Sequence, residues 1–163
     1  MKRIGLISDT HGYLDEAVFK HFAECDEIWH AGDFGAGVVA PLEAFKPLRG
    51  VWGNIDDKGI RQAFPEHNRF MCEDVDVWIT HIGGYPGRYA PQVRPEIYTK
   101  PPKLFITGHS HILKVMFDPK ISCLHINPGA AGKSGWHKVR TLIRFSISGD
   151  KIDNLEVIEL GKR

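Results

Sequence analysis

Short apolar runs rich in β-branched residues recur along the chain, and in its first two-thirds most of them lead into Asp, Asn or His beside glycine. Runs of this length and composition predict buried strands. We expect them at residues 2–8, 27–30, 50–52, 74–80 and 103–106. Apolar positions at helical spacing predict helices over 15–26 and 38–45, with Pro41 tolerated only near the first turn of the second helix.

The last third of the chain has a different pattern. Strand-like stretches follow one another at 114–117, 122–126, 141–148 and 155–160, separated by turn signals. Residues 57–70 are polar and 82–102 are rich in Gly and Pro, so both predict irregular structure. Helices that alternate with strands, followed by strands in succession, predict an α/β fold with a run of antiparallel strands. Without a repeat or a linker, we expect one domain over 1–163.

Composition narrows the classes of function. A formal net charge of +1 gives no reason to expect a general nucleic-acid or membrane surface. No apolar run approaches the length of a membrane span. The three cysteines, Cys25, Cys72 and Cys123, have no metal-ligand spacing. We therefore expect three small buried hydrophobes in a protein of the reducing cytoplasm.

Candidate ligands gather where five predicted strands end. Two histidines one residue apart in an extended segment, such as His109 and His111, project to the same side. The full set contains two carboxylates, one amide and four imidazoles, at Asp9, His11, Asp33, Asn54, His81, His109 and His111. Ligands of α/β sheets bind beyond the carboxyl ends of strands. The set is too large for one metal ion and suits two.

Each of these residues alone has an ordinary structural explanation. Asp9 could cap a helix, and Asp33 could form a turn. Asn54 could adopt a left-handed turn conformation, and His81 could be a core histidine. Coincidence at five strand ends is a poor explanation of the whole set, so we favour a metal site. Without cysteine, the ligands suit Mn first, with Zn, Fe, Ni or Co as alternatives.

The blocks Asp9-x-His11, Gly32-Asp33, Gly53-Asn54, His81 and Gly108-His109-x-His111 resemble the signature of the calcineurin-like metallophosphoesterase superfamily. The small size resembles its single-domain bacterial and archaeal phosphodiesterase branch. The resemblance implies a four-layer α/β/β/α sandwich, in which two facing mixed sheets are flanked by helices. It also implies a phosphoesterase with two divalent transition-metal ions, and within that class a phosphodiesterase acting on a small phosphate ester.

The resemblance assigns the ligands in two sets. One ion would take Asp9, His11, Asp33 and His111, and the other would take Asp33, Asn54, His81 and His109. Asp33 would then bridge, and a hydroxide shared by the ions would attack phosphorus in line. Asp33, Asn54 and His109 would be the catalytic centre of this arrangement.

Ile55 departs from the family pattern. Many members have His after the Asn of the Gly-Asn block, and that His is thought to protonate the leaving group or hold the phosphate. Losing a general acid typically costs about 10²–10⁴-fold, least for good leaving groups. We therefore expect weak phosphomonoesterase activity and a tilt toward diesters. The neighbouring Asp56 is expected to orient a ligand imidazole.

The loop at 83–89 carries one cation and two aromatic rings directly after His81. We expect Arg88 to bind a phosphate oxygen and Tyr85 or Tyr89 to contact a base or ring of the substrate. A rigid surface loop or a subunit contact is the alternative. Small members of this family often pair, so a homodimer or higher homo-oligomer is also expected.

Two other classes of function compete with the enzyme. Some relatives, such as the small metallophosphoesterase-like subunit of the retromer coat, serve as protein-binding scaffolds and have lost a site residue, notably the His of the first block. His11 is present here. Hydrolysis of a non-phosphate bond finds no support, because a His-x-His-x-Asp-His run is absent and so is a Gly-x-Ser-x-Gly elbow.

Overall fold

Two five-stranded mixed sheets form the centre of the computed structural model, which describes residues 1–163. The first sheet has the strand order β12-β11-β1-β2-β3. Its strands are β1 (Lys2–Ile7), β2 (Glu27–His30), β3 (Leu48–Gly50), β11 (Val139–Ser148) and β12 (Lys151–Lys162). β1, β2 and β3 are parallel, whereas β11 runs antiparallel to both β1 and β12.

The second sheet has the order β4-β5-β8-β10-β9. Its strands are β4 (His67–Cys72), β5 (Val75–Thr80), β8 (Leu104–Ile106), β9 (Lys114–Asp118) and β10 (Cys123–Asn127). β5, β8 and β10 are parallel, with antiparallel strands at both edges. A small hairpin, β6 (Gly84–Tyr85) and β7 (Arg88–Tyr89), follows β5.

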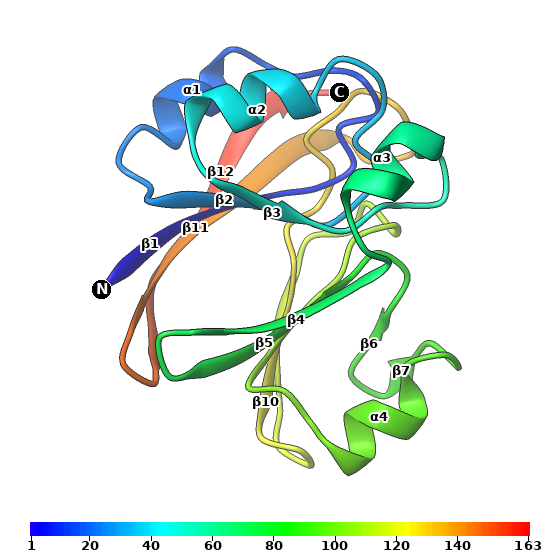
Figure 1. Ribbon diagram of the computed structural model, residues 1–163, viewed down its shortest axis with the longest axis vertical. Helices are drawn as coiled ribbons and strands as arrows, with labels where there is room; N and C mark the ends of the chain where they lie inside the picture. Colours follow the sequence, from blue (N-terminus) through cyan, green and yellow to red (C-terminus); the bar gives the residue numbers. More distant parts are fainter.

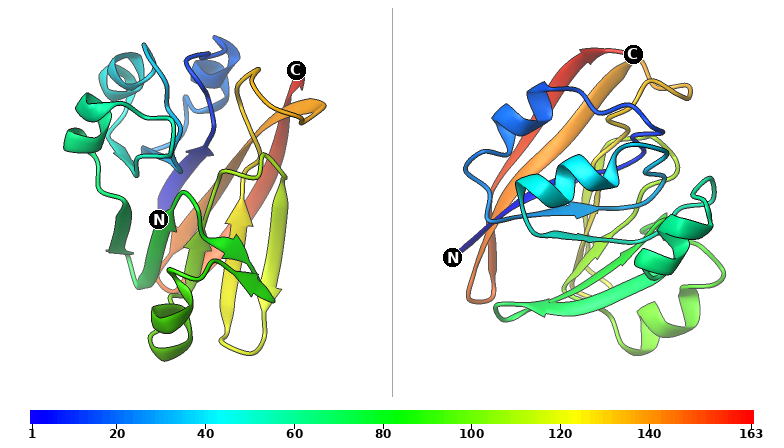
Figure 2. Two further views of the ribbon diagram at one scale, coloured as in Figure 1. Left: turned by 90° about the vertical axis from the view of Figure 1, so that its right-hand side faces the viewer. Right: turned by 45° about the horizontal axis from the view of Figure 1, so that its top comes forward.

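The sheets pack face to face and helices cover their outer faces, which confirms the four-layer expectation (Figures 1 and 2). Apolar residues from both sheets, such as Leu6, Trp29, Ile79 and Ile106, form the core between them. α1 (Ala17–His21) and α2 (Val39–Phe45) pack on the outside of the first sheet. α4 (Arg94–Thr99) packs on the outside of the second, and α3 (Lys58–Ala63) follows β3.

The structure corrects several predicted boundaries. The helix expected over 15–26 is shorter, because α1 ends at His21 and Phe22 turns under the first sheet. Phe22 lies so close to Gly5 that a Cβ there would meet its ring at 2.7 Å. β3 ends at Gly50 rather than residue 52.

Both segments predicted to be irregular contain regular structure. Residues 57–70 contain α3, whose N-terminus is capped by the Asp57 carboxylate accepting from the Ile60 N–H, and most of β4. Residues 82–102 contain the β6–β7 hairpin and α4. These elements are too short for their periodicity to stand out from polar neighbours.

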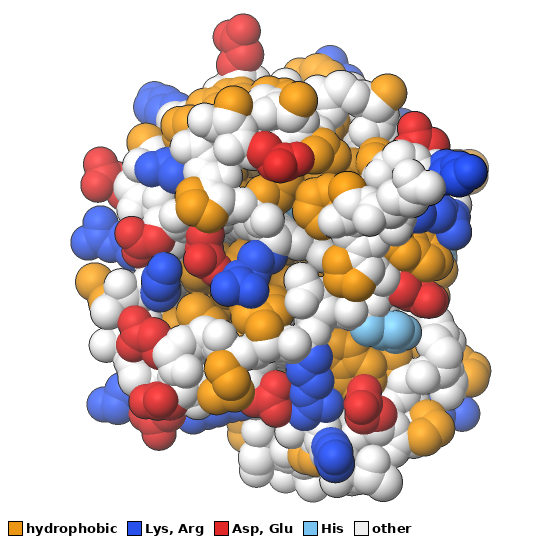
Figure 3. Space-filling model, viewed as in Figure 1, with side chains coloured by type: hydrophobic (Ala, Val, Ile, Leu, Met, Phe, Trp, Pro, Cys, Tyr) orange, Lys and Arg blue, Asp and Glu red, His pale blue; other side chains and the backbone are white.

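The surface carries charges of both signs, and the cysteines lie in the interior. Cationic and anionic side chains are interspersed on the face shown in Figure 3. All three cysteines are free and buried. No helix has the length and apolar character that a membrane span requires.

Candidate metal centre

The candidate ligands lie in loops at the carboxyl ends of β1, β2, β5 and β8, together with the loop that follows β3. Six of them form two groups, Asp9, His11 and His111 in one and Asp33, His81 and His109 in the other. Within each group the potential ligand atoms all lie within 4.8 Å of one another. The structure thus brings together residues that are far apart in sequence, such as Asp9 and His111.

Asp9 uses its two oxygens differently. Its Oδ2 accepts hydrogen bonds from Ser8 Oγ at 2.6 Å and from the His109 backbone N–H at 3.1 Å. Its Oδ1 is buried without a hydrogen-bond partner and lies 3.1 Å from His111 Nε2 and 3.8 Å from His11 Nε2. One oxygen is anchored, and the other faces the imidazoles.

The two oxygens of Asp33 also have different partners. Its Oδ1 accepts from the Ile55 backbone N–H at 3.0 Å. Its Oδ2 lies 3.4 Å from His11 Nε2 and 3.1 Å from His81 Nε2. This oxygen therefore faces one imidazole from each of the two groups.

The imidazoles are oriented by their other nitrogens. His81 Nδ1 donates to the Ala31 carbonyl at 2.7 Å, so its Nε2 carries a free lone pair. His109 Nδ1 lies 3.1 Å from Asn54 Oδ1. The Nε2 atoms of His11 and His81 are buried and have no hydrogen-bond partner. Buried unpartnered nitrogens facing an unpartnered carboxylate oxygen fit divalent cations.

The two carboxylates make the electrostatic potential of the cluster negative. Burial raises the pKa of Asp9, but the nearby imidazoles of His11, His111 and His81 outweigh burial and leave this pKa lowered. The pKa of Asp33 is likewise lowered, because His81 outweighs burial. The nearby Asp9 carboxylate raises the pKa of His11. The field therefore favours positive charge at this position.

The backbone at the centre is strained. Five of the candidate ligands have positive φ, from 46° to 72°, namely Asp9, His11, Asp33, His109 and His111. Residues other than glycine adopt this region rarely, and they do so mostly where the surroundings enforce it. Tight turns at the strand ends aim these side chains into a shared space.

Asp56 does not form the expected bond to an imidazole. Its buried carboxylate accepts from the backbone N–H groups of Phe34 at 3.2 Å, Gly35 at 3.0 Å and Gly53 at 2.8 Å. Three amides from two loops converge on it, and no hydrogen bond joins it to a histidine. Asp56 therefore holds the Asp33 loop against the Asn54 loop.

His30 joins the loops after β1 and β2 through hydrogen bonds. Its Nδ1 accepts from the Gly32 N–H at 3.1 Å, which leaves Nε2 to donate to Thr10 Oγ1 at 3.0 Å. Thr10 in turn donates to the Phe34 carbonyl at 2.7 Å. Complete burial lowers the pKa of His30 to about 3, so it is neutral at pH 7.

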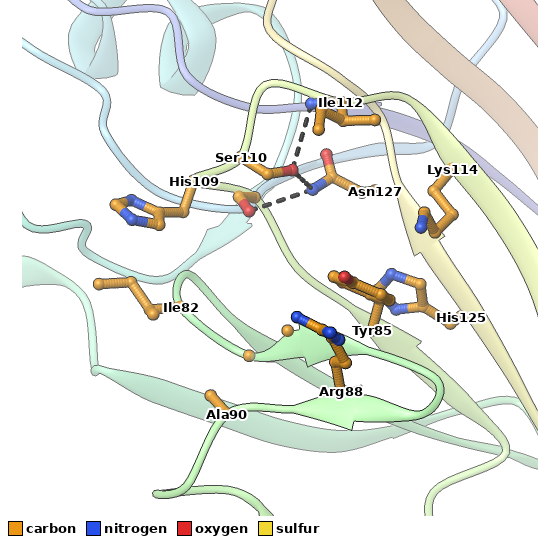
Figure 4. A pocket seen from close by; sticks show the side chains of 13 residues that line it. Ile82, Tyr85, Arg88, Ala90, His109, Ser110, Ile112, Lys114, His125 and Asn127 are labelled. Atoms are coloured by element: carbon orange, nitrogen blue, oxygen red, sulfur yellow. Dashed lines mark hydrogen bonds between the residues drawn. The ribbon is translucent and has the colours of Figure 1, made fainter.

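A pocket of about 250 Å³ opens beside His109 (Figure 4). We call it the cationic pocket, after Arg88 and Lys114, which line it together with Tyr85 and His125. Lys114 Nζ lies 3.9 Å from the centre of the Tyr85 ring, so this ring already contacts a cation. Tyr89 does not line the pocket, because it is 2% exposed and its hydroxyl donates to Asp118 at 2.7 Å.

Comparisons with known proteins identify the family. The family model of the calcineurin-like phosphoesterase superfamily domain matches residues 1–150. The chain belongs to this superfamily. A probable metallophosphoesterase from Methanothermobacter thermautotrophicus is 30% identical over 97% of this chain and 92% of that protein.

Solved structures of the superfamily share the fold. An archaeal phosphodiesterase has a TM-score of 0.77 at 20% identity, over 97% of this chain and 99% of that one. Vps29 from Entamoeba histolytica, solved in complex with Zn²⁺, has a TM-score of 0.73 at 15% identity, over 98% of each chain. The two facing sheets are thus those of a calcineurin-like phosphoesterase, a family of metal-binding hydrolases of phosphoester bonds.

Three residues around the phosphoesterase centre escaped sequence reasoning. Ser8 anchors Asp9, although nothing in the strand pattern distinguishes it. His137 packs its ring 5.1 Å from that of His111, although it lies 26 positions later in a glycine-rich stretch. Lys114 begins β9 only three residues after His111, and this proximity is the one signal that could have placed it near the site.

Proposed function

We propose that this protein is a phosphodiesterase that uses two divalent transition-metal ions, with Mn favoured. The observation that carries the proposal is the position of Asp33 Oδ2, which faces His11 and His81 from the two ligand groups at 3.4 and 3.1 Å. Asp9, His11 and His111 would hold one ion and Asn54, His81 and His109 the other, with Asp33 shared. Bound ions would supply an activated water and neutralise charge on the phosphoryl oxygens.

The protein's own groups would bind and orient the substrate. His109 belongs to one ligand group and also lines the cationic pocket, so the pocket and the metal centre are continuous. A phosphodiester at the centre would place one of its two alcohol arms in the pocket, beside Arg88. Asn54, 3.1 Å from His109 Nδ1, would keep that imidazole aligned.

Ile55 supports diesters over monoesters as substrates. It is 46% exposed at the position where many superfamily members carry the leaving-group histidine, and its side chain cannot transfer a proton. Without a general acid, substrates with good leaving groups suffer least. The alternative, a protein-binding scaffold, is less well supported, because His11 is present and both carboxylates keep an oxygen directed at the imidazoles.

The test compares hydrolysis of bis(4-nitrophenyl) phosphate and 4-nitrophenyl phosphate with Mn²⁺, with chelator, and with the His109→Ala variant. We expect Mn²⁺-dependent turnover that favours the diester and falls by at least about 10²-fold in the variant. An Ile55→His variant should raise monoester turnover relative to diester turnover. No turnover with any divalent metal would overturn the enzyme proposal, and a monoester preference in the wild type would overturn the argument from Ile55.

A further inference from the structure

Arg88 differs from every other arginine of the protein. Its guanidinium forms no ion pair and donates no hydrogen bond within the chain, although it lines a pocket beside a candidate active site. The other eight each pair with a carboxylate or donate to a carbonyl: Arg3, Arg49, Arg61, Arg69, Arg94, Arg140, Arg144 and Arg163. A planar guanidinium without a partner is free to bind an anion through two parallel hydrogen bonds.

Lys114 is the second cation of the pocket, and it also lacks a carboxylate partner. Its ammonium forms no hydrogen bond or ion pair within the chain, and Nζ lies 3.9 Å from the centre of the Tyr85 ring. None of the 13 residues that line the pocket is Asp or Glu. Figure 4 shows Tyr85 between Arg88 and Lys114 in that view. The pocket therefore has two cations and no compensating charge of its own.

His125 adds no third charge. It is 1% exposed, and its Nδ1 donates to the Phe105 carbonyl at 3.1 Å. Burial lowers its pKa to about 4, so the imidazole is neutral at pH 7. The remaining lining groups bear no ionisable side chain apart from Tyr85 and from His109, which belongs to the metal centre. Two positive charges therefore match a phosphomonoester, which carries about −1.5 to −2 at pH 7, better than they match a carboxylate.

The volume of the pocket limits what enters. About 250 Å³ is below the range of about 300–1,000 Å³ typical of sites for whole drug-sized ligands. One arm of a substrate fits this space, with the rest of the molecule at the metal centre next to His109.

We infer that the cationic pocket selects phosphodiesters in which one alcohol arm carries a second, terminal phosphate group, with Arg88 and Lys114 as its ligands. The inference rests on the proposed function, because it places the scissile phosphate at the metal centre. It makes Arg88 and Lys114 specificity residues for the remote phosphate.

A matched pair of chromogenic diesters tests the inference. Thymidine 5′-(4-nitrophenyl phosphate) is compared with the same compound bearing a 3′-phosphate, since both release 4-nitrophenolate. We expect kcat/KM to be about tenfold or more higher for the 3′-phosphorylated compound, mostly through a lower KM. Equal values, or a preference for the compound without the second phosphate, would overturn the inference.

Substitution of the two cations assigns the preference to the pocket. In Arg88→Gln and in Lys114→Gln the ratio of the two kcat/KM values should fall by about three- to tenfold, and in the double variant it should approach one. Lys151→Gln, which removes an exposed lysine of β12 on the other sheet, should keep the wild-type ratio. Because each ratio is measured on one protein sample, a partly unfolded variant does not distort it. A ratio that persists in the double variant would show that the pocket is not responsible.

A binding measurement separates failure of this inference from failure of the proposed function. If the wild type hydrolyses neither compound, both are titrated into it uncleaved, with Mn²⁺ present, by calorimetry. Tighter binding of the 3′-phosphorylated compound, weakened at least threefold by Arg88→Gln, would support the pocket while the enzyme proposal fails. Equal affinities would overturn the inference as well.

Discussion

The two sheets contribute to the centre in different ways. The first sheet supplies both carboxylates, Asp9 and Asp33, from the ends of β1 and β2. The second supplies three of the four imidazoles, His81, His109 and His111, from the ends of β5 and β8. Each ligand group therefore draws on both sheets. The apolar core between the sheets sets the distance between carboxylates and imidazoles, so packing far from the centre controls its geometry.

The loops of the two sheets are also anchored differently. Loops of the first sheet bind one another, through Asp56 and through Asp33 Oδ1 on the Ile55 N–H. Loops of the second sheet also bind one another, through the Gly108 N–H on the His81 carbonyl, but in addition they bind across to the first sheet, through His81 Nδ1 on the Ala31 carbonyl and the His109 N–H on Asp9 Oδ2. We refer to the loops of the first sheet as the frame, on which these cross-sheet bonds align the second.

The largest effect is expected where the two sheets meet. A Cβ on Gly108 would lie 2.3 Å from Ser8 Oγ, 2.8 Å from Asp9 Oδ2 and 3.0 Å from the Ala31 carbonyl. Gly108→Ala should therefore displace the His109 loop from the first sheet. A misplacement of about 1 Å can cost about 10²-fold in rate, so we expect kcat/KM for bis(4-nitrophenyl) phosphate to fall by at least that factor.

Gly59→Ala is the matched control for this substitution. Gly59 lies in α3, where an added Cβ meets nothing closer than Asp57 Oδ1 at 3.5 Å. Alanine in a helix should leave activity unchanged and raise the free energy of unfolding by up to about 1 kcal/mol. Equal activity of both variants would contradict the alignment of the second sheet through Gly108.

An intermediate effect is expected within the frame itself. Asp56→Asn keeps the shape of the side chain but removes the charge that three backbone amides share. Hydrogen bonds to charged groups are worth about 1.5–3 kcal/mol, so the free energy of unfolding in urea should fall by about 2 kcal/mol. Activity should fall about tenfold, because the Asp33 and Asn54 loops loosen.

Asp57→Asn controls for the loss of a neighbouring carboxylate. Asp57 accepts from the Ile60 N–H as the N-cap of α3, and Asn caps helices about equally well. This variant should therefore match the wild type within about 0.5 kcal/mol. Identical behaviour of the two variants would show that Asp56 is an ordinary turn residue.

The smallest effect is expected from lowering the pH, which protonates one buried histidine on each sheet when the protein unfolds. Burial lowers the pKa of His30 on β2 to about 3 and of His125 on β10 to about 4, whereas both are 6.5 when unfolded. Because each pKa is depressed in the folded state, the unfolded state binds the proton more tightly. The stabilising contribution of each neutral histidine is therefore present above pH 6.5 and declines as the pH falls toward 4. Between pH 7 and pH 5.5, each histidine should lower the free energy of unfolding by about 1 kcal/mol.

Urea unfolding of the wild type and of His125→Asn at both pH values measures this contribution. The asparagine amide retains a donor to the Phe105 carbonyl while removing the titrating group. The variant should lose about 1 kcal/mol less than the wild type on acidification. The same pH dependence in both proteins would contradict the buried neutral state of His125.

Sequence reasoning recovered those parts of the fold that follow from local patterns. Buried strands such as β2 and β5 are marked by continuous or alternating apolar residues, and the sharp turns after them carry recognisable Asp, His and Gly. The chain order of these blocks was enough to identify the superfamily and, through it, the layered fold.

The parts that it missed depend on contacts between distant residues. Asp56 binds loop amides rather than an imidazole because the Phe34 and Gly35 N–H groups, some twenty positions earlier, point at it. Tyr89 is buried, and its hydroxyl donates a hydrogen bond to Asp118, which lies 29 positions later. α3 and α4 are each six residues long, which leaves fewer than two turns in which a periodic pattern could register.

The position of β1 has a consequence for synthesis of the chain. This first strand lies in the middle of its sheet, between β2 and β11, and β11 begins only at Val139. A nascent chain therefore carries Asp9 long before His111 emerges, and it carries both before β1 gains its second neighbour. Since translation proceeds at about 5–20 residues per second, the two ligand groups stay incomplete for several seconds. Metal ions should accordingly bind after the two sheets have associated. Binding would then stabilise a domain that is already largely folded, and it would not initiate folding.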